Sequence, residues 1–325
     1  FLSGETRCRG ATRRGAWIGS FADIILLDEP ENDDHKQDEL APRYDARWIA
    51  HWCCKHANAD VKTFGTTPRL VNHETDLSPI LSVSLRVHIR HPSGKTSIPM
   101  IQGDTLVALR EHEGPRVIIH PVRGTYARLV CRDCGWRAAC EHCHGDLAPD
   151  IHDTRCRTCG KTAALPLACE SCGGTSLNKS WPGLVTLKEA WAKHETDLAV
   201  SWRDLSNESM DAPFPKQVLV VVTDGALLGG ISEDIRRQER RLIAFRRLAS
   251  HVAIADGSLI IQCHEDLSNG WADWLTPEGV EAAMERERKE RKTFGYPPAI
   301  RLVKIITQGD ENAAHTWMRG IKDIL

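Results

Sequence analysis

Four pairs of cysteines dominate the middle of the chain. Each pair has the spacing C-x-x-C, and together they use eight of the twelve cysteines: Cys131 and Cys134, Cys140 and Cys143, Cys156 and Cys159, Cys169 and Cys172. This spacing lets two thiolates from one tight turn reach the same ion, and a glycine that follows three of the pairs frees the backbone of the turn. Secreted disulfide frameworks rarely repeat one spacing in this way. The sequence therefore predicts two zinc ions in closed, structural four-thiolate sites.

The spacing does not decide which pairs share an ion. Adjacent pairs could combine, or the two outer pairs could enclose the two inner ones. His142, His144 and His152 lie in the same segment and could compete as ligands. With eight thiols available, we interpret these histidines as loop residues. A closed site has no open position for water, so hydrolytic zinc chemistry is not expected.

A second chemical pattern lies near the start of the chain. The apolar residues 24–27 predict a buried strand, and Asp28 and Glu29 follow it directly. In nucleotide triphosphatases this layout places an aspartate on Mg²⁺ and a glutamate on the attacking water. We therefore take Asp28 and Glu29 as the candidate catalytic residues, with ATP and Mg²⁺ as cofactors. The phosphate-loop pattern G-x-x-x-x-G-K-[ST] does not occur, and residues 93–96, which imitate its tail, predict a hairpin turn.

The elements that must position these residues indicate an α/β protein. Apolar runs at 24–27, 117–120, 217–222 and 258–262 predict strands that alternate with helical stretches. Thr276 and Pro277 have the cap and first-position signals of a helix that should run to about Thr293 and end near Gly295. The charged run at 285–292 within this helix is interpreted as a solvated face.

Length and composition indicate a folded protein with two or more domains. The chain has 325 residues with 41% hydrophobic content, and its 42 basic residues are balanced by 44 acidic ones. It therefore lacks a global positive field, and any contact with nucleic acid must be local. The apolar runs are too short to cross a bilayer and no leader opens the chain, so we expect a cytoplasmic protein without membrane contact.

One local patch of arginines is a candidate for such a contact. Six of them fall within twelve residues: Arg236, Arg237, Arg240, Arg241, Arg246 and Arg247. At about 100° per residue most of them lie opposite Ile235, Leu242 and Phe245, which predicts an amphipathic helix with a cationic face. This face is either a solvated surface or a contact with the DNA backbone, for which Arg236, Arg237, Arg240 and Arg241 are the candidates.

The cysteine-rich segment is a poorer phosphate binder. Residues 123–179 hold eight basic and six acidic side chains, and each zinc with four thiolates adds net negative charge. Contact with a protein, or strand separation by a rigid wedge, suits this segment better.

The cysteine-rich segment at 123–173 resembles that of the PriA family (primosomal protein N′) of bacterial replication-restart helicases. Six further landmarks resemble family motifs in the family's order: Asp28-Glu29, Lys36-Gln37, PRYDAR at 42–47, GTTP at 65–68, WPGL at 181–184 and GYPPAIRL at 295–302. The resemblance implies RecA-like superfamily 2 helicase lobes, a two-zinc module inserted in the second lobe, and a small α+β C-terminal domain.

The resemblance also implies a division of the chain and a set of partners. Residues 1–75 would end the first lobe, 76–125 would start the second, 126–178 would form the module, 179–264 would complete the second lobe, and 265–325 would form an incomplete C-terminal domain. DNA-binding domains and the phosphate loop would precede Phe1. The implied partners are forked or single-stranded DNA, primosome proteins and the single-stranded-DNA-binding protein.

The family likewise implies a nested arrangement of ligands. One zinc would take the outer pairs, and the other would take the inner pairs. The outer set is Cys131, Cys134, Cys169 and Cys172, and the inner set is Cys140, Cys143, Cys156 and Cys159.

The chain departs from the family at the motor motifs. The family's DEEH is replaced by residues DEPE at 28–31, and the segments at 222–230 and 245–253 lack the family's second-lobe patterns, including the arginines that reach the γ-phosphate. Arg246 or Arg247 could substitute for them. Losing such an arginine typically costs about 10³ to 10⁵ in turnover. Two functions are therefore carried forward: an ATP-driven helicase that reloads the replication machinery at stalled forks, and a non-motor zinc-bearing scaffold for fork DNA and primosome proteins.

Overall fold

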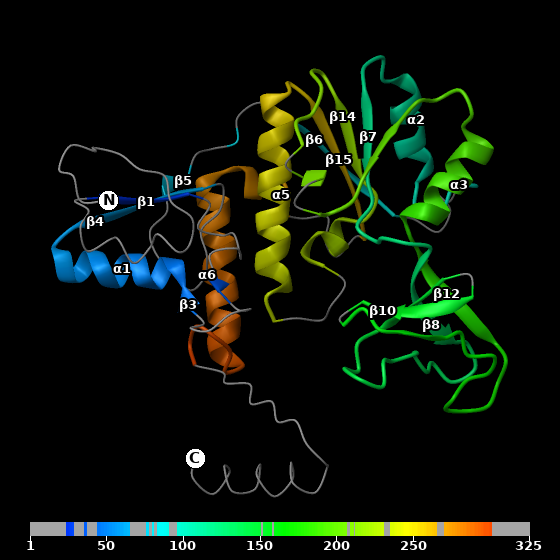
Figure 1. Cartoon of the computed structure of the whole chain (residues 1–325). Coiled ribbons are helices and arrows are strands. Elements are labelled where there is room, and N and C mark those ends of the chain that lie inside the picture. Colours follow the sequence, from blue (N-terminus) through cyan, green and yellow to red (C-terminus); the bar gives the residue numbers. More distant parts are fainter. Residues whose placement is uncertain are drawn as a thin grey trace, which may run out of the picture.

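A computed structural model describes most of the chain between residues 24 and 300 (Figure 1). The described residues are 24–28, 36–37, 44–65, 76–77, 80, 83–90, 96–150, 152–157, 159–206, 209–210, 212–230, 235–264 and 270–300. Within them lie a smaller and a larger parallel sheet, helices that pack on both, and a cysteine-rich module built from short antiparallel strands.

The larger sheet has five parallel strands in the spatial order β13–β7–β14–β15–β6. In chain order they are β6 (Ser84–Ile89), β7 (Arg116–Ile119), β13 (Ser201–Arg203), β14 (Leu219–Val222) and β15 (Ser258–Cys263). The strands predicted at 117–120, 217–222 and 258–262 are thus confirmed, with ends that differ by one or two residues.

Helices cover both faces of this sheet. Val220 and Val222 of β14 face a core that contains Phe245, whereas Leu219 and Val221 face a second core that contains Trp191. The covering helices are α2 (Gly103–Glu111), α3 (Leu184–His194) and α5 (Arg237–Ile254). Because both faces are buried, the strands are continuous apolar runs rather than alternating ones. The predicted α/β class is confirmed by this parallel sheet.

The smaller sheet consists of β1 (Ile24–Asp28), β4 (Asp60–Gly65) and β5 (Asp76–Leu77), all parallel. α1 (Ala46–Ala57) begins after Asp45, whose side chain accepts a hydrogen bond from the backbone of Arg47. The short strands β2 (Lys36–Gln37) and β3 (Tyr44–Asp45) pair nearby. Since β5 belongs to this sheet, the sheet extends past the boundary expected at residue 75.

One feature of β1 differs from the expected buried strand. Leu27 is buried, but Ile24 and Leu26 are more than half exposed. Successive side chains of a strand point to opposite faces, so the described residues cover only one face of this strand.

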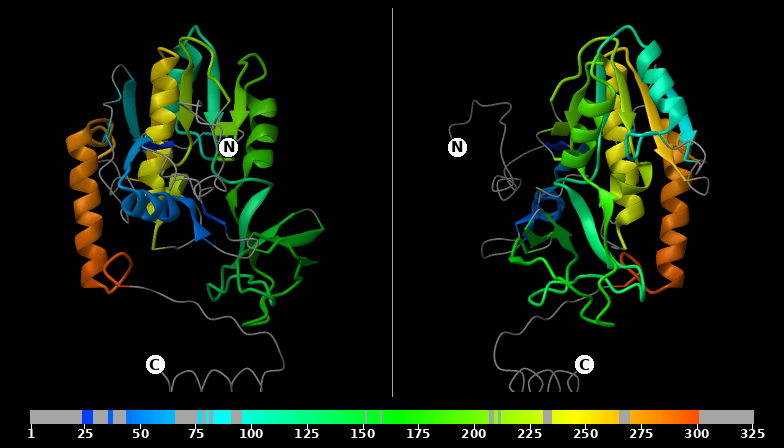
Figure 2. Two further views of the ribbon diagram at one scale, coloured as in Figure 1. Left: turned by 60° about the vertical axis from the view of Figure 1, so that its left-hand side comes forward. Right: turned by 90° about the vertical axis from the view of Figure 1, so that its right-hand side faces the viewer.

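α6 (Pro277–Thr293) confirms the helix predicted from its cap signals. The Thr276 hydroxyl accepts a hydrogen bond from the Gly279 N–H at 3.1 Å, and Pro277 occupies the first turn. The helix packs beside α5, and two 3-10 turns complete this region: η4 (Gly225–Gly229) and η6 (Asp273–Leu275) (Figures 1 and 2).

The charged run of α6 is not wholly solvated, which corrects the sequence-based interpretation. Arg291 is buried because it shares the inward stripe of Val280 and Met284. Its guanidinium lies 3.3 Å from the fully buried Glu239 carboxylate of α5 and 2.8 Å from that of Glu287. A buried guanidinium needs such partners, because an unpaired charge in the interior is costly.

We expect Arg291→Ala to destabilise the protein by about 3 kcal/mol, because it removes a buried cation that pairs with the buried Glu239 carboxylate. The free energy of unfolding in urea would measure this loss. The double variant Arg291→Ala/Glu239→Gln should recover part of it, since the amide carries no charge. Exposed Arg288, which also pairs with a glutamate of α6, is the matched control: Arg288→Ala should change the unfolding free energy by less than about 1 kcal/mol. Equal losses for the two arginines would contradict this account.

Candidate metal centre

The cysteine-rich module is an insertion carried on two paired strands. β8 (Tyr126–Cys131) enters it and β12 (Leu177–Pro182) leaves it, and the two pair antiparallel with Cys131 opposite Leu177. Between them lie β9 (Leu147–Pro149), β10 (Asp153–Cys156) and β11 (Thr162–Ala164). Figure 1 shows the module below the larger sheet, on the side away from α6.

Each cysteine pair adopts the same tight turn. The residue after the second cysteine donates its N–H to the carbonyl of the first, at 2.7 to 3.0 Å in all four turns. That residue has positive φ each time, at 74° for Gly135, 75° for Gly160, 71° for Gly173 and 58° for His144. The left-handed conformation explains the three glycines noted in the sequence. His144 shows that the fourth turn imposes the same geometry without a glycine.

The turns bring the eight cysteines together as two separate tetrads. Within each tetrad the four sulfurs lie within 4.8 Å of one another. The outer tetrad is Cys131, Cys134, Cys169 and Cys172, and the inner one is Cys140, Cys143, Cys156 and Cys159. The nested arrangement implied by the family resemblance is therefore the one that the structure has, and the adjacent alternative is not. None of His142, His144 and His152 belongs to either set among the described residues.

The sulfur separations suit a tetrahedral metal ion. Across the outer tetrad they are 3.7 Å for Cys131 and Cys172 and 3.6 Å for Cys134 and Cys169. Across the inner tetrad they are 3.7 Å for Cys140 and Cys159 and 3.4 Å for Cys143 and Cys156. A tetrahedron with Zn–S bonds of about 2.3 Å has sulfurs about 3.8 Å apart, whereas a disulfide requires about 2.05 Å. The two tetrads could thus hold metal ions.

Without a cation the tetrads cannot carry four thiolates. The Gly145 N–H lowers the pKa of Cys143, but hydrogen bonds among the neighbouring thiols and burial raise it to about 12. The Cys172 thiol has the same balance, with Gly174 as its backbone donor, and its pKa is also about 12. Thiols this close titrate as one unit. A bound divalent cation would supply the charge that ionises them all.

The base of the module is clamped to the larger sheet. The N–H of Gly183 donates to the Thr125 carbonyl at 2.6 Å, and that of Leu184 donates to Val122 at 2.8 Å. A side chain at position 183 would overlap the carbonyl oxygen of Gly124, so only glycine permits this approach. The chain entering the module and the start of α3 leaving it are therefore held together.

His120 joins this base to the sheet, a role that the sequence analysis did not identify. Burial lowers its pKa to about 4, so the imidazole is neutral at pH 7. Nε2 lies 2.9 Å from the Pro182 carbonyl, which only accepts, so Nε2 carries the proton and Nδ1 accepts from the Thr223 hydroxyl at 2.6 Å. The sequence signal that could have identified His120 is a polar residue directly after an apolar strand. At the same edge of the sheet, Arg90 pairs with Asp224 at 2.7 Å.

The candidate DNA-binding arginines do not form one exposed face. Arg241 is buried and donates to the Ala226 carbonyl at 3.2 Å, and Arg237 donates to the same oxygen at 3.3 Å. Arg236 and Arg240 are partly exposed, and Arg236 lies 3.6 Å from Glu239. The physical reason is that α5 is covered by the sheet on one side and by α6 on another (Figure 2). The cationic face predicted for α5 is therefore smaller than the helical periodicity indicated.

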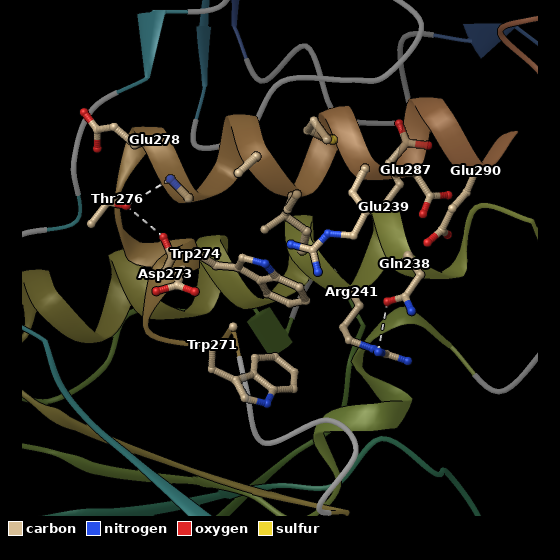
Figure 3. Close-up of a pocket in the computed structure, with 17 residues that line it drawn as sticks. Gln238, Glu239, Arg241, Trp271, Asp273, Trp274, Thr276, Glu278, Glu287 and Glu290 are labelled. Carbon is tan, nitrogen blue, oxygen red and sulfur yellow. Dashed lines mark hydrogen bonds between the residues drawn. The ribbon is translucent and has the colours of Figure 1, made fainter. Parts of the chain in front are cut away.

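Arg241 also lines a hollow that is unsuited to phosphate. Figure 3 shows it between α5 and α6 together with Trp271, Trp274 and several carboxylates. The acidic residues of this lining are Glu239, Asp273, Glu278, Glu287 and Glu290. They outnumber its two arginines, Arg241 and Arg286, so the local charge opposes an anion.

Arg246 cannot replace the missing γ-phosphate arginine. It is fully buried, and its guanidinium donates to the Trp274 carbonyl at 2.6 Å. This overturns the suggestion that Arg246 could reach a nucleotide across a cleft.

Asp28 ends β1 and lies in register with Phe64 of β4. Gly65, the first residue of the GTTP segment, ends β4, so these two landmarks share one edge of the smaller sheet. Glu29 and residues 66–68 lie outside the described residues.

No helix among the described residues has the length and apolar character needed to span a membrane.

No protein-family model matches the chain. Curated relatives do match: the replication restart protein PriA of Haemophilus influenzae is 25% identical over 334 residues, which cover 88% of this chain and 45% of the relative. PriA of Thermotoga maritima is 26% identical over 325 residues, covering 87% and 43%, respectively. PriA of Bacillus subtilis is 24% identical over 203 residues, covering 55% and 25%.

The chain spans less than half the length of these relatives. At 87 to 88% of the chain in the two longer matches, the similarity extends well beyond the cysteine-rich module. This chain is a PriA-like protein.

Proposed function

We propose that the chain forms part of a replication-restart protein, which binds forked or single-stranded DNA and helps to reload the replication machinery with primosome proteins. The observation that carries the proposal is the pair of nested tetrads, clamped to a five-stranded parallel sheet, in a chain that is similar to PriA over 88% of its length. We assign the smaller sheet to the first helicase lobe and the larger sheet to the second.

The two tetrads hold zinc in this proposal. All eight ligands are thiolates, which favour zinc over hard cations, and a closed tetrahedral set serves structure rather than hydrolysis. The Cys140 and Cys156 sulfurs also pack in a small core with Leu129, Ala138 and Leu147. The ions would therefore take the place of a larger core and keep the module rigid, as a wedge or a protein-binding surface requires.

Two mechanisms fit a restart role, a motor and a scaffold. Asp28 and Glu29 remain the candidate ligands for Mg²⁺ and water in the motor. The burial of Arg246 favours the scaffold, because it removes one of the two arginines that could have acted at the γ-phosphate. For the DNA backbone, the partly exposed Arg236, Arg237 and Arg240 are better candidates than buried Arg241.

Metal analysis of double variants tests the zinc proposal and the nesting together. The wild-type protein should contain about two zinc ions per chain. Cys131→Ala/Cys140→Ala damages both nested tetrads and should contain about none, whereas Cys131→Ala/Cys169→Ala damages only the outer tetrad and should retain about one. With adjacent pairing these two results would be exchanged. Cys53→Ala, which removes a buried thiol outside both tetrads, is the control and should retain both ions.

DNA-stimulated ATP hydrolysis by the full-length protein distinguishes the two mechanisms. We expect the wild-type rate to be no higher than that of Glu29→Gln, because the second-lobe arginine pattern is missing and its loss typically costs about 10³ to 10⁵ in turnover. Both proteins should bind forked DNA with equal affinity, which serves as the control for folding. A wild-type rate well above that of Glu29→Gln would establish the motor instead of the scaffold.

A further inference from the structure

α1 exposes two tryptophans on its outer side. Trp48 is 57% exposed and Trp52 is 58% exposed. The buried stripe of the helix contains Ala46, Ala50 and Cys53, which pack toward the smaller sheet. At about 100° per residue the two tryptophans lie on the side directly opposite this stripe. Their placement is therefore unrelated to the packing of α1 in its own core.

Exposure of this kind needs an explanation. Tryptophan is strongly buried on average, and an amphipathic surface helix normally carries polar side chains opposite its core. Two adjacent tryptophans in that position form a contiguous apolar surface, which is a common mark of a binding site.

The aromatic surface continues for one more turn. The His56 ring lies 4.4 Å from the Trp52 ring, measured between centroids, at an interplanar angle of 52°. Trp48, Trp52 and His56 are spaced four residues apart, so they lie on the same side of α1 at successive turns, with backbone positions about 6 Å apart along the axis. We refer to these three residues as the aromatic face of α1.

The charge of α1 indicates the class of partner. The helix contains no Asp or Glu, and its last turn carries Lys55 and His56. Asp45, which precedes it, is paired with the buried guanidinium of Arg47. A helix that carries cationic and no acidic side chains of its own beside an aromatic surface suits a polyanion that has flat apolar faces.

We propose that the aromatic face of α1 binds single-stranded nucleic acid by stacking bases on Trp48 and Trp52. Because Trp48 and Trp52 lie one helical turn apart on the same side of α1, one flexible strand can place a base on each of them. Lys55 lies at the edge of this face and can contact the phosphates. The inference rests on the proposed role of the protein in binding DNA at forks, and it assigns the single strand to a specific surface.

Binding of a fluorescently labelled oligothymidylate to the full-length protein tests this proposal. Trp48→Ala and Trp52→Ala should each weaken binding by about tenfold, the loss typical of one base–aromatic stack. Trp52→Phe should retain most of the affinity, whereas Trp52→Leu should lose it, since leucine keeps apolar area but provides no ring. The salt dependence of binding should be unchanged in the tryptophan variants and become shallower in Lys55→Ala, because only the latter removes a charge.

The matched control is Val107→Ala, which removes an exposed apolar side chain from α2, outside every proposed site, and should bind the oligonucleotide like the wild type. Unchanged affinity in Trp48→Ala/Trp52→Ala, with fork binding intact, would overturn the inference and leave the proposed function standing. Full affinity in Trp52→Leu would also overturn it and would point to a protein partner on this surface. If the wild type bound neither single strands nor forks, both proposals would fall.

Discussion

The cysteine-rich module depends on the electrostatic repulsion between closely spaced thiolates. Four thiols whose sulfurs lie within 4.8 Å of one another cannot all ionise without a cation, and neighbouring thiols raise the pKa of Cys143 and Cys172 to about 12. A divalent ion in each tetrad would remove this repulsion, because all four thiolates would share it as ligands. Because the outer tetrad joins both ends of the module, an ion bound there would close the insertion at the level of the paired strands β8 and β12.

The clamped base transmits this rigidity to the larger sheet. Gly183 lets the backbone of the departing chain approach the arriving chain, and neutral His120 ties the same point to the end of β7. The module is therefore an extension of the sheet edge rather than a domain on a flexible tether. Such an arrangement suits a part that must hold a fixed position against DNA or a protein.

Local patterns were sufficient for some features. The C-x-x-C spacings predicted the turns, apolar runs predicted three of the five strands of the larger sheet, and Thr276 with Pro277 predicted the start of α6. These signals depend on residues close in sequence, so they can be read without a tertiary structure. The nesting of the tetrads required the family resemblance, because spacing alone permits two arrangements.

Features that depend on packing between elements could not be predicted in this way. Helical periodicity places Arg246 beside Leu242 on the apolar side of α5 and Arg241 outside this stripe. Both arginines are buried because the helix is covered on more than one side. Arg291 is buried for a similar reason, since its carboxylate partner Glu239 comes from another helix 52 residues away. The exposure of Trp48 and Trp52 could not be predicted either, because composition gives no reason to expect tryptophans outside a core.

This PriA-like chain combines two cysteine tetrads that could hold metal ions with segments at 222–230 and 245–253 that lack the family's motor patterns. We propose that two closed four-thiolate zinc sites organise the module. X-ray absorption at the zinc edge of the purified protein would identify the ligands. We expect a first shell of four sulfurs at about 2.3 Å and no nitrogen or oxygen ligand. A shell containing nitrogen or oxygen would contradict it.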